Sequence, residues 1–322
     1  MIRVLLVGAG GMGSCHLDCW RRMDDVEIAG ICDVFEGRAA EKALPGEAVF
    51  TDMDEALATL TDLDIVDIAT PSYLHRELSC KSLARGIHTV CEKPLALSKE
   101  DGEAVFKTAE EAGVFFMTAQ VVRFMKPYLA LREMVKTSRF GNVLRARFNR
   151  LSGTPDWSWE NWMMDEKKSG GVPFDLSIHD VDYIVSVFGK PDRVEKTRTV
   201  HREDGRLTDA YRADLTYGDA CISAEAGWYS GKMPFSATFT VVFEQAVVSF
   251  DGAALHVYHA TGESEEIDLT TDSNAISGIN ITSGDGYFEE LSYFKRCVQT
   301  NTAPTAVPKE EVLCVLSLAE QK

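Results

Sequence analysis

The sequence is poor in positive charge. It has 33 lysines and arginines against 50 aspartates and glutamates, which gives a formal net charge of −17. Nucleic acids and anionic membranes bind basic surfaces, so a strongly acidic chain suits neither of them. We therefore expect no nucleic acid and no membrane among its partners, and we interpret the acidity as a source of solubility.

Long apolar runs are also absent from the sequence. A membrane-spanning helix needs about 20 consecutive apolar residues, and the longest apolar runs here are far shorter. The first residues enter a strand-like run at once and leave no room for a signal peptide. These features predict a cytoplasmic protein.

The cysteines lack the spacing of a disulfide framework or a zinc site. None of the eight forms a Cys-x-x-Cys pair or a zinc-type grouping with histidine. Several lie within apolar patterns, where a thiol acts as a small hydrophobic group. We expect a reducing compartment, no disulfides and no metal site.

Strand-like and helix-like stretches alternate over the first 120 residues. A chain of 322 residues is too long for one ordinary core. Apolar runs at 4–8, 26–33, 65–70, 87–92 and 114–120 are continuous enough to be buried on both faces. The alternation predicts an α/β fold with a doubly wound parallel sheet of the Rossmann type over residues 1–122.

The pattern changes after residue 122. A strand is expected near 143–149 and a helix over 173–188, and six strand-like runs then follow between Gly, Asp and Asn turns. We predict that residues 123–322 form an α+β substrate-binding domain with a large, mostly antiparallel sheet. Few helices remain to cover that sheet, which favours an oligomer. The last helix, near 309–320, either stays with this domain or returns to the first.

A glycine loop follows the first strand and opens the first helix. It matches G-x-G-x-x-G. The first glycine allows the tight turn, the second lets the backbone approach a pyrophosphate at the helix N-terminus, and the third lets helix and strand pack closely. The loop therefore predicts dinucleotide binding by Gly8, Gly10, Gly11, Met12 and Gly13.

Asp33 lies twenty positions after Gly13, at the end of the second strand. A carboxylate there accepts hydrogen bonds from the ribose hydroxyls and repels a 2′-phosphate, so the cofactor is expected to be NAD. Arg38 keeps NADP as the alternative, because a nearby guanidinium could hold a 2′-phosphate.

Further candidates lie where strands end. Thr70 and Pro71 follow one buried strand and occupy the sheet edge at which open α/β folds bind ligands. His75 either borders the cofactor or lies in the first turn of a surface helix. Glu92 ends the next strand and is a candidate for a ribose hydrogen bond.

Lys93 follows Glu92 and precedes Pro94, which disfavours helical backbone for the lysine. An ammonium at this edge can reach a substrate oxygen or the nicotinamide. The alternative is an exposed loop lysine.

Asp175 and His179 are four positions apart and would share one face of the helix over 173–188. Histidine is the natural base for an alcohol proton, because it titrates near neutrality. Asp175 would bind a neighbouring hydroxyl, and Lys93 would stabilise the developing alkoxide. The alternative is an Asp/His pair on a helix surface. Asp180 and Asp182 are expected to be solvated on other faces.

Three tryptophans crowd the loop before this helix. Trp157, Trp159 and Trp162, with Asn161, either stack on a sugar ring or pack as core aromatics beneath the loop.

Together these segments resemble the Gfo/Idh/MocA family of oxidoreductases, which includes glucose–fructose oxidoreductase and inositol 2-dehydrogenase. The last helix pattern reaches the chain end at Lys322, where family members usually continue for a turn or more. The matching segments span roughly residues 1–190 and are the loop 8–13, Ile68-Ala-Thr-Pro71 with His75, Glu92-Lys-Pro94, Gln120-Val-Val-Arg123-Phe, and Gly170-Gly171 with Asp175, His179 and Asp180.

The resemblance implies that Lys93, Asp175 and His179 are catalytic, that Gln120 contacts the cofactor and that Arg123 contacts the substrate. Trp162 is a further candidate for a substrate contact, because its ring could stack on a sugar. It also implies an open-faced C-terminal sheet through which a homodimer or homotetramer forms. The implied activity is hydride transfer between NAD and a secondary hydroxyl of a sugar, sugar derivative or cyclitol.

Two other activities stay open. One is a redox-assisted glycosidase or sugar–sugar oxidoreductase, either of which would keep its cofactor tightly bound. The other is a nucleotide-sensing regulator without catalysis, which would have no need of Lys93 or His179.

Overall fold

The computed structural model describes residues 1–203, 206–231, 233–269 and 285–320. Contacts between residues divide the chain into two compact units. One consists of Met1–Val121 and Gly286–Leu316, and the other of Val122–Asp285 and Ser317–Lys322 as far as they are described. The segment that returns to the first unit begins at Gly286, one helix earlier than the sequence suggested. We expected the last helix pattern to reach the chain end at Lys322, and that residue lies outside the described residues.

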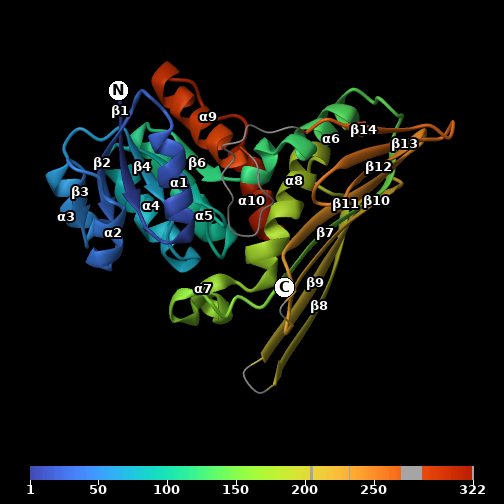
Figure 1. The fold of residues 1–322 in the computed structure, drawn as a ribbon, viewed down its shortest axis with the longest axis horizontal. Coiled ribbons are helices and arrows are strands. Elements are labelled where there is room, and N and C mark those ends of the chain that lie inside the picture. Colours follow the sequence, from blue (N-terminus) through green and yellow to red (C-terminus); the bar gives the residue numbers. More distant parts are fainter. Residues whose placement is uncertain (204–205, 232, 270–284, 321–322) are drawn as a thin grey trace. The chain divides into compact units, whose positions relative to one another are not determined.

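The first unit is built on a parallel sheet with the strand order β3-β2-β1-β4-β5-β6 (Figure 1). The order reverses between β1 and β4, and doubly wound folds bind ligands at the carboxyl edge of such a point. This confirms the predicted class of fold. The strands are β1 (Ile2–Val7), β2 (Val26–Cys32), β3 (Ala48–Phe50), β4 (Ile65–Ile68), β5 (His88–Glu92) and β6 (Phe116–Ala119).

Helices accompany each strand of this unit. We did not predict β3 or α2, because three and seven residues are too few for a clear apolar period. Helix α9 packs on α1. The helices are α1 (Gly11–Arg21), α2 (Glu36–Lys42), α3 (Met53–Thr59), α4 (His75–Ala84), α5 (Lys99–Ala112), α9 (Gly286–Thr300) and α10 (Lys309–Ala319), the last of which ends in the second unit.

The described part of the second unit contains an eight-stranded sheet with the order β14-β13-β12-β11-β7-β10-β9-β8 (Figure 1). Only β7 and β10 pair in parallel among its described strands. The predicted large, mostly antiparallel sheet is therefore confirmed. The strands are β7 (Val143–Gly153), β8 (Arg193–Glu203), β9 (Arg206–Tyr217), β10 (Ala220–Tyr229), β11 (Ser236–Phe243), β12 (Ala246–Phe250), β13 (Leu255–His259) and β14 (Ser264–Ile267).

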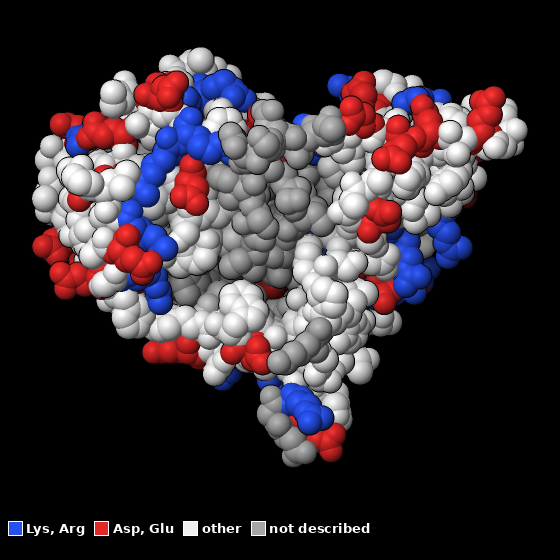
Figure 2. Space-filling model, in the orientation of Figure 1, with Lys and Arg blue, Asp and Glu red and all other residues white. Residues whose placement is uncertain are grey.

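One face of this sheet is buried and the other carries polar side chains. Helices α6 (Lys126–Lys136) and α8 (Ile178–Phe188) lie on the buried side, where the rings of Tyr128 and Phe239 are 5.2 Å apart. On the other face of β7, Arg147 forms an ion pair with Glu225 of β10. Figure 2 shows that both units carry both signs of charge on the face in view.

Candidate functional site

The glycine loop joins β1 to α1, and two of its glycines are sterically required. Gly8 has φ +95°, and a Cβ added there would lie 2.5 Å from the carbonyl oxygen of Ala69. A Cβ on Gly13 would lie 1.7 Å from the carbonyl oxygen of Gly8. No larger residue fits either position while strand and helix keep this spacing.

The same loop fits a dinucleotide pyrophosphate. Gly10 precedes α1, and a Cβ placed on it would meet no atom within 4 Å, so a ligand can approach the backbone closely. The N–H groups of the first helical turn, which includes Gly11, Met12 and Gly13, have no partner within the helix and suit an anion. Thr70 Oγ1 is buried beside this loop without a hydrogen-bond partner among the described residues.

Asp33 directly follows β2, and its carboxylate holds the glycine loop. Its carboxylate accepts hydrogen bonds from the N–H groups of Ala9 and Phe35, each at 2.9 Å. Arg38 lies 3.2 Å from the same carboxylate, and its guanidinium lies 5.0 Å from the centre of the Phe35 ring. The residue expected to exclude a 2′-phosphate and the residue expected to accept one are therefore neighbours.

His75 is the first residue of α4, and its side chain is buried, with 1% of its surface exposed. Its Nδ1 lies 2.7 Å from the carbonyl oxygen of Pro94, and its Nε2 lies 2.7 Å from that of Thr70. The ring thus ties together the loops that follow β4 and β5. Burial lowers the pKa of His75, and the two carbonyls offset this only in part.

A buried charge network that we did not predict is centred on His16 of α1. Its Nδ1 lies 3.0 Å from Oδ2 of Asp67, and its Nε2 lies 3.0 Å from Oε1 of Glu92. Trp20 donates a 2.6 Å hydrogen bond to Asp67. Burial alone would lower the pKa of His16, but the two carboxylates outweigh it and raise that pKa well above its usual range. The sequence did offer a signal for a buried histidine here. His16 follows Gly13 by three positions and shares a helix face with the apolar Trp20.

Lys93 directly follows this network at the end of β5. Its backbone N–H donates to Oε2 of Glu92 at 3.0 Å, and its peptide bond to Pro94 is cis. Both carboxylate oxygens of Glu92 therefore have partners inside the protein, which favours a structural role over the expected ribose contact. Burial would raise the pKa of Glu92, but His16 outweighs it and the pKa lies below its ordinary value.

We predicted that Asp175 and His179 lie on one regular α-helix, and this is wrong. Residues Pro173–Ser177 form a π-helical turn that contains Asp175, and α8 begins after it, with His179 in its first turn. Both side chains are buried. Single π-helical turns within helices occur frequently at functional sites.

The prediction that Asp180 and Asp182 are solvated is wrong. Asp180 accepts from Nε and Nη2 of Arg150 at 3.1 and 2.8 Å. Asp182 accepts from Nε and Nη2 of Arg123 at 2.7 and 2.6 Å. All four side chains are at least 98% buried. This pairing favours a structural role for Arg123, which we had placed at the substrate.

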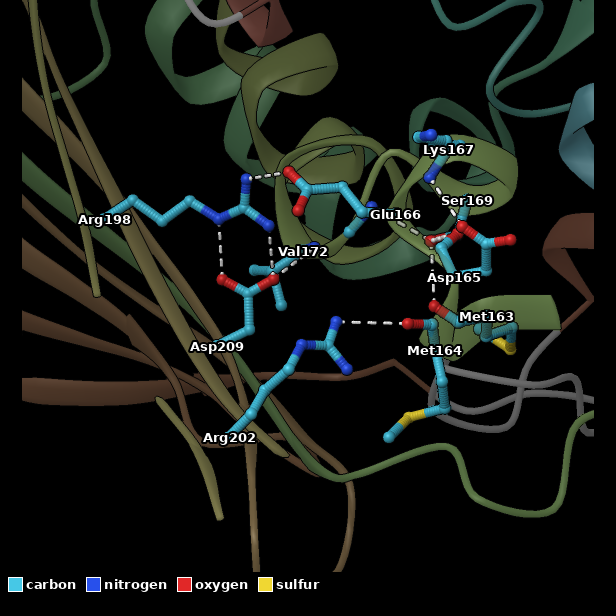
Figure 3. Close-up of polar contacts among 11 residues, drawn as sticks. Met163, Met164, Asp165, Glu166, Lys167, Ser169, Val172, Arg198, Arg202 and Asp209 are labelled. Atoms are coloured by element: carbon cyan, nitrogen blue, oxygen red, sulfur yellow. Dashed lines mark hydrogen bonds and ion pairs between the residues drawn. The ribbon is translucent and has the colours of Figure 1, made fainter. Parts of the chain in front are cut away.

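The tryptophan loop leads into a short segment that is fastened to the second sheet (Figure 3). Trp162 is half-buried in the 3-10 segment Trp159–Met164, whereas Trp157 is 59% exposed, so the core alternative is wrong for Trp157. Glu160 and Asn161 both have left-handed backbone, with φ of 49° and 54°. Arg202 of β8 donates to the carbonyl of Met164 at 3.1 Å.

Arg198 of β8 fastens the segment more firmly. It donates to both carboxylate oxygens of Asp209 on β9, at 2.8 and 2.7 Å, and to Glu166 of α7 (Glu166–Ser169) at 2.6 Å (Figure 3). Asp209 also accepts from the backbone N–H of Val172 at 3.1 Å. The chain is thus held by the sheet immediately before the π-helical turn that carries Asp175.

The other expected site residues are placed by their elements. Pro71 precedes the 3-10 turn Ser72–Leu74, and Gln120 is buried just after β6. Tyr287 of α9 donates to Sδ of Met12 at 3.8 Å. Within the described residues no group of three or more His, Cys, Asp or Glu is arranged to hold a metal ion. In the same part of the chain, no helix has the length and apolarity needed to cross a membrane.

Two sequence models of one family match the chain. The model described as "Oxidoreductase family, NAD-binding Rossmann fold" matches residues 2–120, and the GFO/IDH/MocA C-terminal domain matches residues 128–249. Together they cover most of both units.

Curated relatives and solved structures agree with this match. Inositol 2-dehydrogenase from Arthrobacter sp. is 33% identical over 78% of this chain and 74% of its own. The 2,7-anhydro-N-acetylneuraminate hydratase from Mediterraneibacter gnavus is 29% identical over 60% of this chain, which spans only 51% of that protein. Levoglucosan dehydrogenase, solved with NADH and levoglucosan, has a TM-score of 0.82 over 99% of this chain and 95% of its own, at 20% identity. This last similarity concerns the fold.

Proposed function

Because this chain belongs to the Gfo/Idh/MocA oxidoreductase family, we propose that it is a cytoplasmic, NAD-dependent dehydrogenase of sugars, sugar derivatives or cyclitols. The substrate carbon carries a secondary hydroxyl. The nicotinamide, when bound, accepts or returns the hydride of that carbon. The observation that carries the proposal is the glycine loop, where an open Gly10 backbone and a buried Thr70 hydroxyl, unpartnered in the part of the chain that the structure describes, fit a dinucleotide.

The proposed roles follow from the chemistry of an alcohol oxidation. His179 takes the hydroxyl proton, because an imidazole can hold a proton near neutral pH. The ammonium of Lys93 stabilises the negative charge that develops on the same oxygen. Asp175 accepts a hydrogen bond from a neighbouring hydroxyl of the substrate. Relatives named for inositol and D-glucoside dehydrogenation support this substrate class.

NAD is proposed ahead of NADP because Asp33 directly follows β2 and contacts the glycine loop. A carboxylate in this position repels a 2′-phosphate. Arg38 is already paired with that carboxylate, which reduces its capacity to attract a phosphate. We also propose a homodimer or homotetramer formed through the polar face of the second sheet, to be checked by light scattering coupled to size-exclusion chromatography.

A panel of monosaccharides, inositols and glycosides, assayed with NAD and with NADP, tests the activity directly. His179→Ala should lose about 100-fold to 10,000-fold in kcat, the usual contribution of a general base, while NAD affinity stays unchanged. His201→Ala is the matched control, because His201 is an exposed histidine of β8. Near-native turnover of the His179 variant would contradict the base assignment. NAD binding without turnover on the whole panel would contradict the activity.

A further inference from the structure

The segment that carries Lys93 is held by a chain of buried side chains that have no place in the proposed chemistry. Lys93 donates its backbone N–H to Glu92, and Glu92 accepts from His16 through its other oxygen. His16 in turn contacts Asp67, which accepts from Trp20. The chain connects α1, β4 and β5 within the first unit.

Because these linked side chains are buried, the stability of their arrangement depends on how their charges are balanced. The side chains of His16 and Asp67 are completely inaccessible, and that of Glu92 is 7% exposed. Two carboxylates in such a place are costly unless a cation lies between them. An imidazolium satisfies both at once, because each of its nitrogens then donates a hydrogen bond.

We propose that His16 is a positioning residue for Lys93: its imidazolium holds the Glu92 carboxylate, which in turn holds the backbone of the catalytic lysine. The inference rests on the proposed function for the role of Lys93. His16 does not touch the substrate. Its contribution is to keep the turn after β5 in one arrangement, as hydrogen-bond partners one step removed from a reacting group commonly do.

The opposite side of the turn is held separately. His75 of α4 contacts the carbonyl oxygen of Pro94, the residue after Lys93. Both neighbours of the lysine are therefore anchored, one through Glu92 and His16 and the other through His75.

The groups that face Glu92 and His16 come from several elements. Lys93 and His75 lower the pKa of Glu92 electrostatically, and Asp67 of β4 raises the pKa of His16. The thiol of Cys15 on α1 interacts electrostatically with both His16 and Glu92. Cys91 precedes Glu92 on β5, and the ring of Tyr287 on α9 lies 6.0 Å from that of His16. Among these, His16 is the cation placed between the two buried carboxylates.

The test compares two buried residues of the same helix. His16→Gln removes the cation and leaves a polar side chain. Trp20→Phe is the matched control, because Trp20 is equally buried and donates its hydrogen bond to Asp67, two contacts removed from Glu92. Glu92→Gln keeps the shape of the carboxylate and serves as the second variant if His16→Gln does not fold.

The first measurement needs no substrate. Amide hydrogen exchange of the segment 91–95 should be at least about 10-fold faster in His16→Gln and in Glu92→Gln than in the wild type, and unchanged in Trp20→Phe. Unchanged exchange in the His16 and Glu92 variants overturns the proposal, whether or not a substrate is known.

The second measurement uses turnover. His16→Gln should lose about 10-fold to 100-fold in kcat per folded molecule, while the dissociation constant for NAD stays within about 3-fold. The kcat of His16→Gln should also fall at low pH, unlike that of the wild type. Without the cation, burial raises the pKa of Glu92, so that its carboxylate takes up a proton. The double variant His16→Gln/Glu92→Gln should lack that loss. A purely structural histidine would lower stability and leave kcat and its pH profile unchanged, which would overturn the proposal. Absence of turnover in the wild type on every substrate would instead contradict the proposed function, and hydrogen exchange would still decide the positioning.

Discussion

Buried charge supports the predicted catalytic residues in both units, but the cations differ. In the first unit, the turn that carries Lys93 is held by the imidazolium of His16 and, through a hydrogen bond, by the ring of His75, whose pKa is lowered by burial. In the second unit, α8 and the preceding turn are held by the guanidinium groups of Arg123, Arg150 and Arg198. Guanidinium stays charged at every pH at which a protein folds, whereas imidazole gains or loses its charge near neutrality.

This difference separates the two halves by their response to pH. The support around Asp175 and His179 should be constant, because each arginine is paired with an aspartate. The support around Lys93 should change with pH, because it depends on two histidines. Four predictions test the comparison.

The largest effect is expected from Arg150→Met. Removing the guanidinium leaves Asp180 buried without its cation, which should cost about 3–5 kcal/mol of unfolding free energy. Arg147→Met is the matched control on the same strand, since Arg147 and its partner Glu225 are 58% and 29% exposed. Exposed pairs contribute about 0–1 kcal/mol. Urea unfolding of both variants measures the difference, and equal losses would contradict the assignment of Arg150 as a buried support.

Asp209→Asn should have the next largest effect. It weakens the charged contact with Arg198 and the hydrogen bond from Val172, and hydrogen bonds to charged groups are worth about 1.5–3 kcal/mol. Limited proteolysis should cleave within residues 157–172 faster than in the wild type. Asp214→Asn, on the same strand but paired with an exposed Arg212, should leave the cleavage rate unchanged. No change in Asp209→Asn would show that Arg198 does not fasten this segment.

The third prediction concerns the sign of the pH effect at His16. The pKa of this histidine is raised in the folded state, so its stabilisation is complete below the ordinary value of 6.5 and declines as pH rises through the folded-state pKa. The expected slope is up to about 1.4 kcal/mol per pH unit. The difference in unfolding free energy between wild type and the double variant His16→Gln/Glu92→Gln, which lacks both titrating groups, should shrink as pH rises above 6.5. A constant difference would mean that the ring carries no extra proton when folded.

His75 should show the opposite sign and a smaller effect. Burial lowers its pKa, so the folded state resists a proton that the unfolded chain accepts, and stability declines as pH falls below about 6.5. His75→Gln should reduce this loss at low pH and leave the response above neutrality intact. Titration curves of the two histidines by NMR would check both signs in one experiment. If His75 titrated above 6.5, the carbonyl contacts would outweigh burial.

Much of the fold could be predicted from local sequence. Continuous apolar runs separated by helix-like stretches indicated the parallel sheet. The G-x-G-x-x-G motif indicated a dinucleotide-binding loop directly after β1. The short strand Ala48–Phe50 was missed because three residues show no period. The π-helical turn was missed because the sequence between Pro173 and Ser177 reads as ordinary helix.

The site was predicted less completely than the fold. Asp180 and Asp182 look solvated when only their helix is considered. Their arginines lie 30 and 59 positions away, on β7 and just after β6. His16 escaped notice for the same reason, since Asp67 and Glu92 are 51 and 76 positions distant. The sequence contains 33 lysines and arginines and 50 acidic residues, and local patterns do not say which of them meet.

The sequence by itself determined the order of most strands and helices and the place of the glycine loop between the first strand and the first helix, because these follow from the pattern of neighbouring residues. The steric need for glycine at Gly8 comes from tertiary structure, since the atom that a Cβ would meet belongs to Ala69, after β4. Tertiary structure alone decided the partner of each buried charge. Burial removes the solvent that would otherwise satisfy a charge, so the opposite charge must come from whichever distant segment the fold brings alongside.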